Sequence, residues 1–159
     1  MSARPGDARA VVVPYERAHQ DAFRRLNEAW ISRYFRIEPP DTRVLEAPQE
    51  EILDKGGHII VAVRGEEVVG VCALLRVDAD TFELVKMAVA ESARGLGIGS
   101  LVGEEAVQRA RRAGASRLIL ESNTVLAPAI ALYRKLGFTE ITGVHSEYAR
   151  CNIHMELRL

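Results

Sequence analysis

The stretch from Thr81 to Gly114 constrains the fold most strongly, because it joins a buried strand to a helix through a turn rich in glycine. Residues 81–90 (TFELVKMAVA) are mostly apolar, which is typical of a strand buried over much of both faces. Residues 94–99 (RGLGIG) then open a helix whose apolar side chains recur with a period of about 3.6 residues. Gly114 is a good end for this helix, since several arginines precede it in the last turn.

The glycines favour a phosphate-binding site at the start of this helix. The first turn of a helix has backbone N–H groups without intrahelical partners and carries a partial positive charge. Glycine removes side chains at that point, so a phosphate can reach the backbone. Ordinary turns also contain glycine, so the interpretation depends on the rest of the chain.

A dinucleotide-binding βαβ unit is the main rival, because a second strand (117–120) follows the helix and ends at the acidic Glu121. The spacing argues against it. The third glycine of G-x-G-x-x-G would fall at Ser100, and residues 90–94 separate the glycines from the preceding strand. The chain after Glu121 is also too short for the remaining βα units.

Two motifs resemble those of the GNAT superfamily of N-acetyltransferases. Residues 94–99 are similar to its R/Q-x-x-G-x-G/A signature, and Asn123 followed by residues 131–138 (ALYRKLGF) is similar to its second motif. The resemblance covers residues 61–138 well and the whole chain more loosely. It implies an α/β GNAT fold, with a mixed, mostly antiparallel sheet of six to seven strands, helices on both faces, and central parallel strands splayed for CoA.

The resemblance also implies acetyl-CoA as the acetyl donor, with no metal. Backbone groups after the central strand would bind pantetheine and the acetyl carbonyl, and Asn123 would orient the cofactor through both ends of its amide. As a mere turn or cap residue, Asn123 would look the same from the sequence. The expected cofactor-binding residues are Met87, Ala88, Val89, Arg94, Gly95, Leu96, Gly97, Ile98, Gly99, Ser100 and Asn123.

Acyl transfer to a primary amine requires a proton acceptor, because an amine with a pKa near 10 is only about 0.1% neutral at pH 7. Glu83 is the acidic residue of the buried strand and stands where some members of the family carry a glutamate base. Its structural alternative is a solvated edge residue or a partner of Lys86. Glu121 is the second candidate for the base, and an ordered water is the third.

The resemblance makes Tyr133 the acid that protonates the departing CoA thiolate, and packing against Phe138 is its alternative role. A further group would border the acceptor site, although its aromatic members suit a core equally well. These residues are Trp30, Tyr34, Glu121, Tyr148 and Arg150. A guanidinium matches a carboxylate bidentately, so Arg150 suggests an amino-acid-like amine as the acceptor.

Length and composition favour one globular domain. The chain has 159 residues, 48% apolar and 27% charged, which suits a single GNAT domain over residues 10–159 after a flexible segment at residues 1–9. A net charge of −1 gives no electrostatic case for nucleic acid or a membrane surface. No apolar run approaches the roughly 20 residues of a membrane span, and we expect a cytoplasmic protein. Cys72, Cys151 and the four histidines show no metal-ligand spacing, so free thiols and no metal are expected.

The remaining elements complete the sheet. Residues 38–41 (EPPD) are expected to be a loop, because each proline restrains its neighbour and removes a donor. Residues 138–144 and 148–157 are expected to form a closing hairpin, in which Cys151 and His154 alternate onto opposite faces. Other expected elements are strands at 10–13, 58–63 and 68–77, and helices at 15–35, 48–53 and 126–136.

These observations predict an N-acetyltransferase that moves acetyl from acetyl-CoA directly to the primary amine of a small molecule within a ternary complex. Two alternatives stay open. The acceptor could be a protein or peptide, or the chain could be an acyl-CoA sensor without catalysis. Homodimers are common in the family, although nothing in the sequence identifies an interface.

Overall fold

The computed structural model describes residues 9–159, so the expected flexible segment at 1–9 lies outside the described residues apart from Arg9. The strands are β1 (Val11–Val13), β2 (His58–Arg64), β3 (Glu67–Arg76), β4 (Thr81–Val89), β5 (Arg117–Ser122), β6 (Thr139–Ile141) and β7 (Ile153–Arg158). The helices are α1 (Gln20–Tyr34), α2 (Pro39–Glu46), α3 (Ile98–Arg112) and α4 (Ala127–Leu136). Short helical turns occupy Arg17–His19, Gln49–Leu53 and Glu91–Ala93. Within residues 9–159, no helix is long and apolar enough to cross a membrane.

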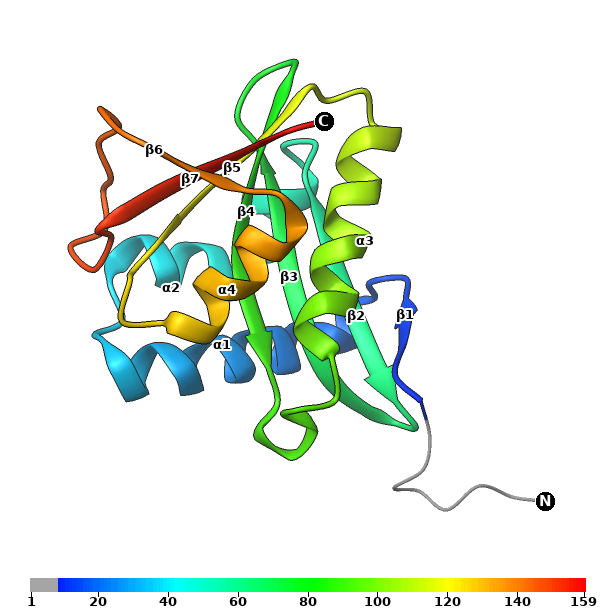
Figure 1. The fold of residues 1–159 in the computed structure, drawn as a ribbon. Helices are drawn as coiled ribbons and strands as arrows, with labels where there is room; N and C mark the ends of the chain where they lie inside the picture. Colours follow the sequence, from blue (N-terminus) through cyan, green and yellow to red (C-terminus); the bar gives the residue numbers. More distant parts are fainter. Residues whose placement is uncertain (1–8) are drawn as a thin grey trace.

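The seven strands form one sheet in the order β1-β2-β3-β4-β5-β7-β6. Strands β4 and β5 run parallel, and the other neighbouring strands are antiparallel. Helices cover both faces, with α3 and α4 in front of the sheet and α1 and α2 behind it in Figure 1. The mixed, mostly antiparallel α/β architecture expected from the sequence is therefore confirmed.

Two apolar clusters hold the helices on the sheet, one on each face. In β2, Ile60 and Ala62 pack with the residues of α3, whereas Ile59 and Val61 pack with those of α1 and α2. This alternation follows from the two-residue period of a strand. Because both faces are covered, the central strands read as nearly continuous apolar runs.

A bulge interrupts β4 at Lys86, whose φ of 54° lies in the left-handed region. The register with β3 shifts there, since Val85 faces Ala73 but Ala88 faces Val71. The bulge changes which alternate side chains of β4 face α3 and α4. Before the bulge, Leu84 belongs to the apolar cluster between the sheet and α3. After the bulge, Met87 packs against this same cluster. A non-glycine residue at positive φ is uncommon and marks a position that the surrounding structure must hold in place.

The two parallel strands separate soon after they meet. Strand β4 pairs with β5 only over Thr81–Glu83, opposite Arg117–Ile119, although both strands continue beyond this point. Figure 1 shows β5 leaving β4 at an angle, with α4 in front of the opening. The expected splay is confirmed, and it leaves one edge of β4 without a neighbouring strand.

The expected loop at residues 38–41 is wrong, because α2 begins there. Pro39 and Pro40 occupy the first turn, where a helix needs no N–H donor. Glu38 is the N-cap, and its backbone N–H donates to Asp41 Oδ2 at 2.9 Å in a reciprocal capping box. Two prolines therefore start a helix at this point.

The expected closing hairpin is wrong in its boundaries. Strand β6 contains only three residues, and β7 starts at Ile153, so residues 148–152 lie outside the sheet. Tyr148–Asn152 instead form a turn, in which the Cys151 N–H donates to the Tyr148 carbonyl at 3.3 Å. The strict alternation expected for Cys151 and His154 therefore does not apply.

Candidate active site

The glycine-rich loop ends in a helix start that is open to a ligand. Gly97 is the N-cap of α3 at φ +76°, a conformation that side-chain-bearing residues rarely adopt, and it supplies no side-chain cap. The first intrahelical bond runs from the Leu101 N–H to the Gly97 carbonyl at 3.0 Å. The N–H groups of Ile98, Gly99 and Ser100 precede it and have no intrahelical acceptor. They form a cradle suited to a phosphate.

A cavity of about 580 Å³ extends from this cradle into the gap between β4 and β5. Its walls come from α1, from β4 beyond the pairing with β5, from the glycine-rich loop, and from α4. Ten of the eleven cofactor residues expected from the sequence line it, namely Met87, Ala88, Val89, Arg94, Gly95, Gly97, Ile98, Gly99, Ser100 and Asn123. Leu96 does not, since its side chain turns outward and is 55% exposed.

A second cavity of about 300 Å³ lies over the α2 side of the sheet. It contains carboxylates and cations in equal measure: Glu51, Glu83, Glu121, Glu147, Arg43, Lys55, Arg76 and Lys86. Glu83, Val85, Lys86, Glu121 and Tyr148 line both cavities. The two cavities therefore meet where β4 leaves β5.

Glu83 stands at this junction, and its carboxyl has an unusual affinity for a proton. Burial, reinforced by the negative charge of Glu121, raises its pKa from 4.5 to about 7. Lys86 acts on Glu83 only through its charge, which opposes the rise of the Glu83 pKa, because Lys86 Nζ donates its hydrogen bond to Asp41 Oδ1 at 2.5 Å. Glu83 is thus poised to exchange a proton near neutral pH.

Tyr133 lies on α4 at the wall of the larger cavity. Its ring packs edge to face on Phe138 with centroids 6.1 Å apart, so the packing role is real. Burial raises the pKa of its hydroxyl to about 12. The hydroxyl therefore stays protonated at neutral pH and is available as a donor.

Asn123 uses both ends of its amide within the protein. Its Nδ2 donates to the Arg150 carbonyl at 2.7 Å, and its Oδ1 accepts from the Val125 N–H at 2.9 Å. The amide thus joins the turn before α4 to the segment before β7. Asn123 still lines the cavity, but its two bonds are those of a turn residue.

The free edge of β4 offers backbone donors to the larger cavity. The Ala90 N–H donates to Val69 of β3 at 2.8 Å. Backbone N–H groups alternate in direction along a strand, so those of Met87 and Val89 face the opposite edge, where β5 has departed. Both residues line the larger cavity, as donors to a carbonyl or an oxyanion would have to do.

Asp41 joins α2 to Lys86 and Arg150, a role that was not predicted from the sequence. Its fully buried carboxylate accepts from Lys86 Nζ and from both terminal nitrogens of Arg150, at 2.7 and 2.6 Å. Burial alone would raise the pKa of this carboxyl, but the hydrogen bonds from Arg150, Lys86 and the Glu38 backbone lower it to about 2. The signal available in the sequence was an aspartate three residues after a residue that can cap a helix. The two prolines between them made this segment resemble a loop.

The proposed acceptor residues do come together, around Arg150. Its guanidinium lies over the Tyr148 ring at 4.4 Å and over the Trp30 ring at 5.9 Å. Tyr34 lines the same cavity and is 46% exposed. The guanidinium is committed to Asp41 and also bonds Glu38 at 3.3 Å. Arg150 therefore stabilises the wall of the larger cavity. The bidentate bond that we expected it to form with a substrate carboxylate is formed with Asp41 instead.

The fold and site together define an α/β protein with a phosphate cradle at a helix start and an acidic group between two splayed strands. A sequence model described as the "Acetyltransferase (GNAT) family" matches residues 20–138. The chain therefore belongs to the GNAT acetyltransferase family.

Several known proteins are similar to this chain. An uncharacterized N-acetyltransferase of Bacillus subtilis, YvbK, is 31% identical over 62% of this chain and 65% of its own length. An IAA acetyltransferase of Azospirillum brasilense is 41% identical over 52% of this chain and 55% of its own length. The chain thus spans somewhat under two thirds of the relatives' own lengths.

Solved structures agree with the fold. A GNAT-family acetyltransferase of Staphylococcus aureus superposes with a TM-score of 0.83 over 94% of this chain and 98% of its own, at 20% identity. The yncA protein of Salmonella typhimurium, solved with acetyl-CoA, gives a TM-score of 0.76 over 94% and 93%, also at 20% identity.

Proposed function

We propose that this protein transfers an acetyl group from acetyl-CoA to the primary amine of a small molecule. One observation carries the proposal: Glu83, with a pKa near 7, lies where the two cavities meet. A thioester entering from the larger cavity and an amine entering from the smaller one would approach each other beside this carboxylate. Family membership and a relative's structure with acetyl-CoA support the donor.

The larger cavity binds acetyl-CoA in this proposal. The N–H groups at the start of α3 bind the CoA pyrophosphate, and the free edge of β4 binds pantetheine in the manner of a missing strand. The Met87 and Val89 N–H groups lie on that edge and donate to the acetyl carbonyl. An oxyanion that forms there finds its donors already in place, which is worth about 100-fold or more in rate.

Proton transfer completes the reaction. Glu83 accepts a proton from the ammonium form of the substrate and releases it to solvent, and the neutral nitrogen attacks the thioester carbon to form the oxyanion. The C–S bond then breaks, the nitrogen gives its second proton to Glu83, and the CoA thiolate takes the proton of Tyr133, which is reprotonated from solvent. Transfer is direct, so donor and acceptor are bound together. Glu121, which also lines both cavities, and an ordered water are the alternatives for the base.

The smaller cavity favours an amine that also carries an anionic group. Its volume of about 300 Å³ suits a small molecule, and Glu83, Glu121 and Glu147 attract the ammonium. Because Arg150 is committed to the buried Asp41, recognition of a substrate carboxylate falls to Arg43, Lys55 and Arg76. Arg43 and Lys55 form only exposed ion pairs, with Glu147 at 3.9 Å and Glu51 at 3.0 Å, and Arg76 donates to backbone carbonyls, so a substrate can compete for them. An amino-acid-like acceptor therefore remains our proposal, with a changed set of recognition residues. A peptide acceptor and a sensor role without catalysis are the alternatives to this proposal, and a homodimer and a cytoplasmic location stay predictions.

Steady-state kinetics test direct transfer. With both substrates varied, a ternary complex gives intersecting double-reciprocal lines, and acetyl-CoA alone leaves the intact mass of the protein unchanged. Parallel lines together with an acetylated protein would contradict it. Calorimetry of CoA binding without an acceptor separates a failure of the cradle from a failure of the chemistry.

A further inference from the structure

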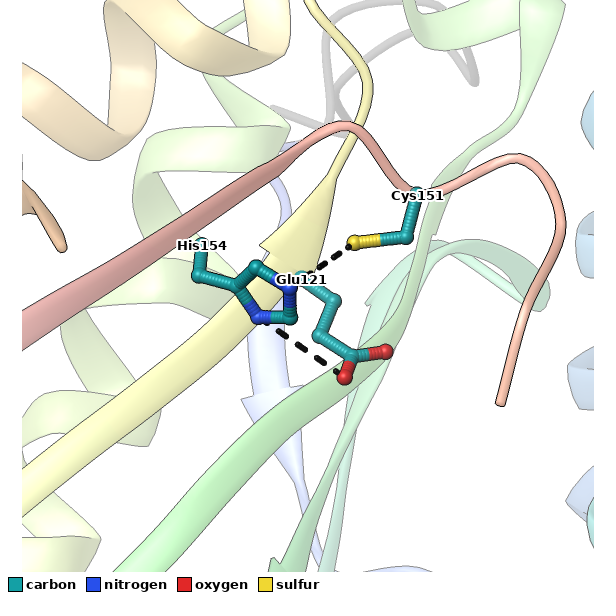
Figure 2. A group of neighbouring side chains, drawn as sticks. All are labelled: Glu121, Cys151 and His154. Carbon is teal, nitrogen blue, oxygen red and sulfur yellow. Dashed lines mark hydrogen bonds and ion pairs between the residues drawn. The ribbon is translucent and has the colours of Figure 1, made fainter. Parts of the chain in front are cut away.

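Three potential metal ligands come together beside the proposed acceptor site. Cys151 Sγ lies 3.6 Å from His154 Nε2, and His154 Nδ1 lies 3.8 Å from Glu121 Oε1. One ligand atom from each residue lies within 4.8 Å of the other two. Figure 2 shows the three side chains converging from β5, β7 and the turn before β7.

Backbone pairing fixes this arrangement. Glu121 of β5 is the direct partner of His154 of β7, so their side chains share one face of the sheet. Cys151 would point to the other face if β7 began earlier. Since β7 begins at Ile153, the preceding turn brings Cys151 back to the side of His154.

With His154 bound through Nε2, the spacing suits a tetrahedral zinc site with one open position. The 3.8 Å contact of Glu121 is to the other ring nitrogen, so the carboxylate has to close on the ion when the ion binds. Thiolate, imidazole and carboxylate are the three zinc ligands of proteins, at about 2.3 Å for sulfur and about 2.0–2.1 Å for nitrogen. Two such ligands on one tetrahedral ion lie about 3.6 Å apart, which is the Cys151 to His154 separation. Cysteine and histidine reach this distance here without rearrangement.

A neighbouring hydroxyl orients the carboxylate. Ser146 Oγ donates to Glu121 Oε2 at 2.7 Å and itself accepts from the Tyr148 N–H at 3.0 Å. Oε1 is the atom turned toward His154. An outer-shell bond of this kind is what holds a ligating carboxylate in place.

We propose that Glu121, Cys151 and His154 bind one Zn²⁺ ion, and that the bound ion inhibits acyl transfer. The side chains of Glu121 and His154 are only 21% and 15% exposed, and the ion reaches them through the cavities that Glu121 and Cys151 line. An ion in this place is held by Glu121, which lines both cavities, and repels a substrate ammonium. The inhibitory effect rests on the proposed function, whereas the binding site does not.

Cobalt substitution tests the site without reference to activity. Tag-free protein, freed of metal with EDTA and dialysed, is titrated with Co²⁺. A thiolate-to-cobalt charge-transfer band should grow to one equivalent per chain and disappear when Zn²⁺ displaces the cobalt. Cys151→Ser should abolish the band, His154→Gln should weaken Zn²⁺ binding by more than about 100-fold, and Ser146→Ala by about 10-fold.

Matched controls use the other residues of the same types. Cys72→Ala removes the other cysteine, which is buried, and His145→Gln removes an exposed histidine of the nearby loop. Both should keep the band. Thermal unfolding followed by circular dichroism identifies any variant that has failed to fold, and only folded variants are compared. Zn²⁺ should raise the melting temperature of the parent protein and leave that of Cys151→Ser unchanged.

Activity is the second readout, with each variant compared with its own rate in EDTA. Zn²⁺ should inhibit acetyl transfer by the parent protein and by Cys72→Ala, and Cys151→Ser should escape that inhibition. Absence of a cobalt band, or a band that survives in Cys151→Ser, would overturn the proposal. A hydroxylamine-labile acetyl group on Cys151 in EDTA, with no cobalt band, would overturn it too, because the same three residues would then be a nucleophilic triad.

Discussion

At the scale of single residues, the structure separates groups that can exchange a proton from groups that only hold the site together. Glu83 and Tyr133 have pKa values displaced by burial, and both line the larger cavity. Asp41 and Arg150 are bound to each other, which keeps both charged. We therefore propose proton transfer as the role of the first pair and positioning as the role of the second.

Replacing Glu83 by Gln should lower kcat by about 100- to 10,000-fold, the usual contribution of a general base, with little change in the KM for acetyl-CoA. Because the active form is the carboxylate, kcat/KM of the parent protein should rise with pH through about 7 and then level off. Rate profiles in EDTA check both effects. Glu140→Gln, an exposed change on β6, is the control. An unaltered profile in Glu83→Gln would assign the base to Glu121 or to water.

The same variant should be more stable than the parent protein at pH 8. A carboxyl whose pKa is raised from 4.5 to about 7 binds more protons in the folded state between these values, so its contribution to stability falls as pH rises through them. Gln removes this loss, for a gain of up to about 3 kcal/mol at pH 8 and none near pH 4. Urea unfolding at the two pH values measures the difference.

Tyr133→Phe removes only a hydroxyl. The contact with Phe138 remains, so the free energy of unfolding should change by less than about 1 kcal/mol. If the hydroxyl protonates the leaving thiolate, kcat should fall by about 100-fold. Single-turnover rates with urea unfolding on the same preparation distinguish the two roles. Undiminished turnover would leave Tyr133 with packing alone.

At the scale of elements, the site depends on where strands and helices start and stop. The start of α3 near Gly97 could be predicted, because glycines leave a local signal, whereas the separation of β4 from β5 was expected only from the resemblance to the family. The bulge at Lys86 and the late start of β7 could not, since each depends on pairing with distant strands. The Asp41 network was missed for the same reason, as its partners lie 45 and 109 residues away.

Gly97→Ala should weaken CoA binding and destabilise the fold. An alanine at φ +76° costs about 1–2 kcal/mol, and its methyl group lies at the phosphate cradle. Gly65→Ala is the matched control, because Gly65 has φ +63° in the turn between β2 and β3, outside both cavities. Both variants should lose similar stability, but only Gly97→Ala should bind CoA at least about tenfold more weakly by calorimetry. Equal affinities would remove the cradle from the account.

Asp41→Asn tests the network that joins α2 to β4 and to the turn before β7. Losing one member of a buried ion pair leaves Lys86 and Arg150 uncompensated, at a cost of about 3–5 kcal/mol. Since the Asp41 pKa is lowered to about 2, its stabilisation is present above pH 4 and is lost as pH falls toward 2. Asp21→Asn breaks exposed pairs with Arg24 and Arg25 and should leave the free energy of unfolding nearly unchanged. Similar losses in the two variants would contradict this.

At the scale of the whole molecule, one sheet brings two cavities together at two carboxylates, Glu83 and Glu121. Both faces of the sheet are covered, yet β4 has a free edge because β5 departs after three paired residues. The family and its architecture could be read from local motifs, whereas the acceptor depends on how residues from α2, β3 and the loop before β7 converge. That convergence became visible only in the folded chain.

Release of free thiol from acetyl-CoA, measured in EDTA against a panel of amino acids, polyamines, aminoglycosides and short peptides, tests the account most directly. We expect release with amino-acid-like amines, one acetylated amine per thiol, and at least a 100-fold loss in Glu83→Gln. CoA binding with no turnover on any amine would contradict catalysis and leave a sensor. Turnover on peptides alone would contradict the small-molecule acceptor.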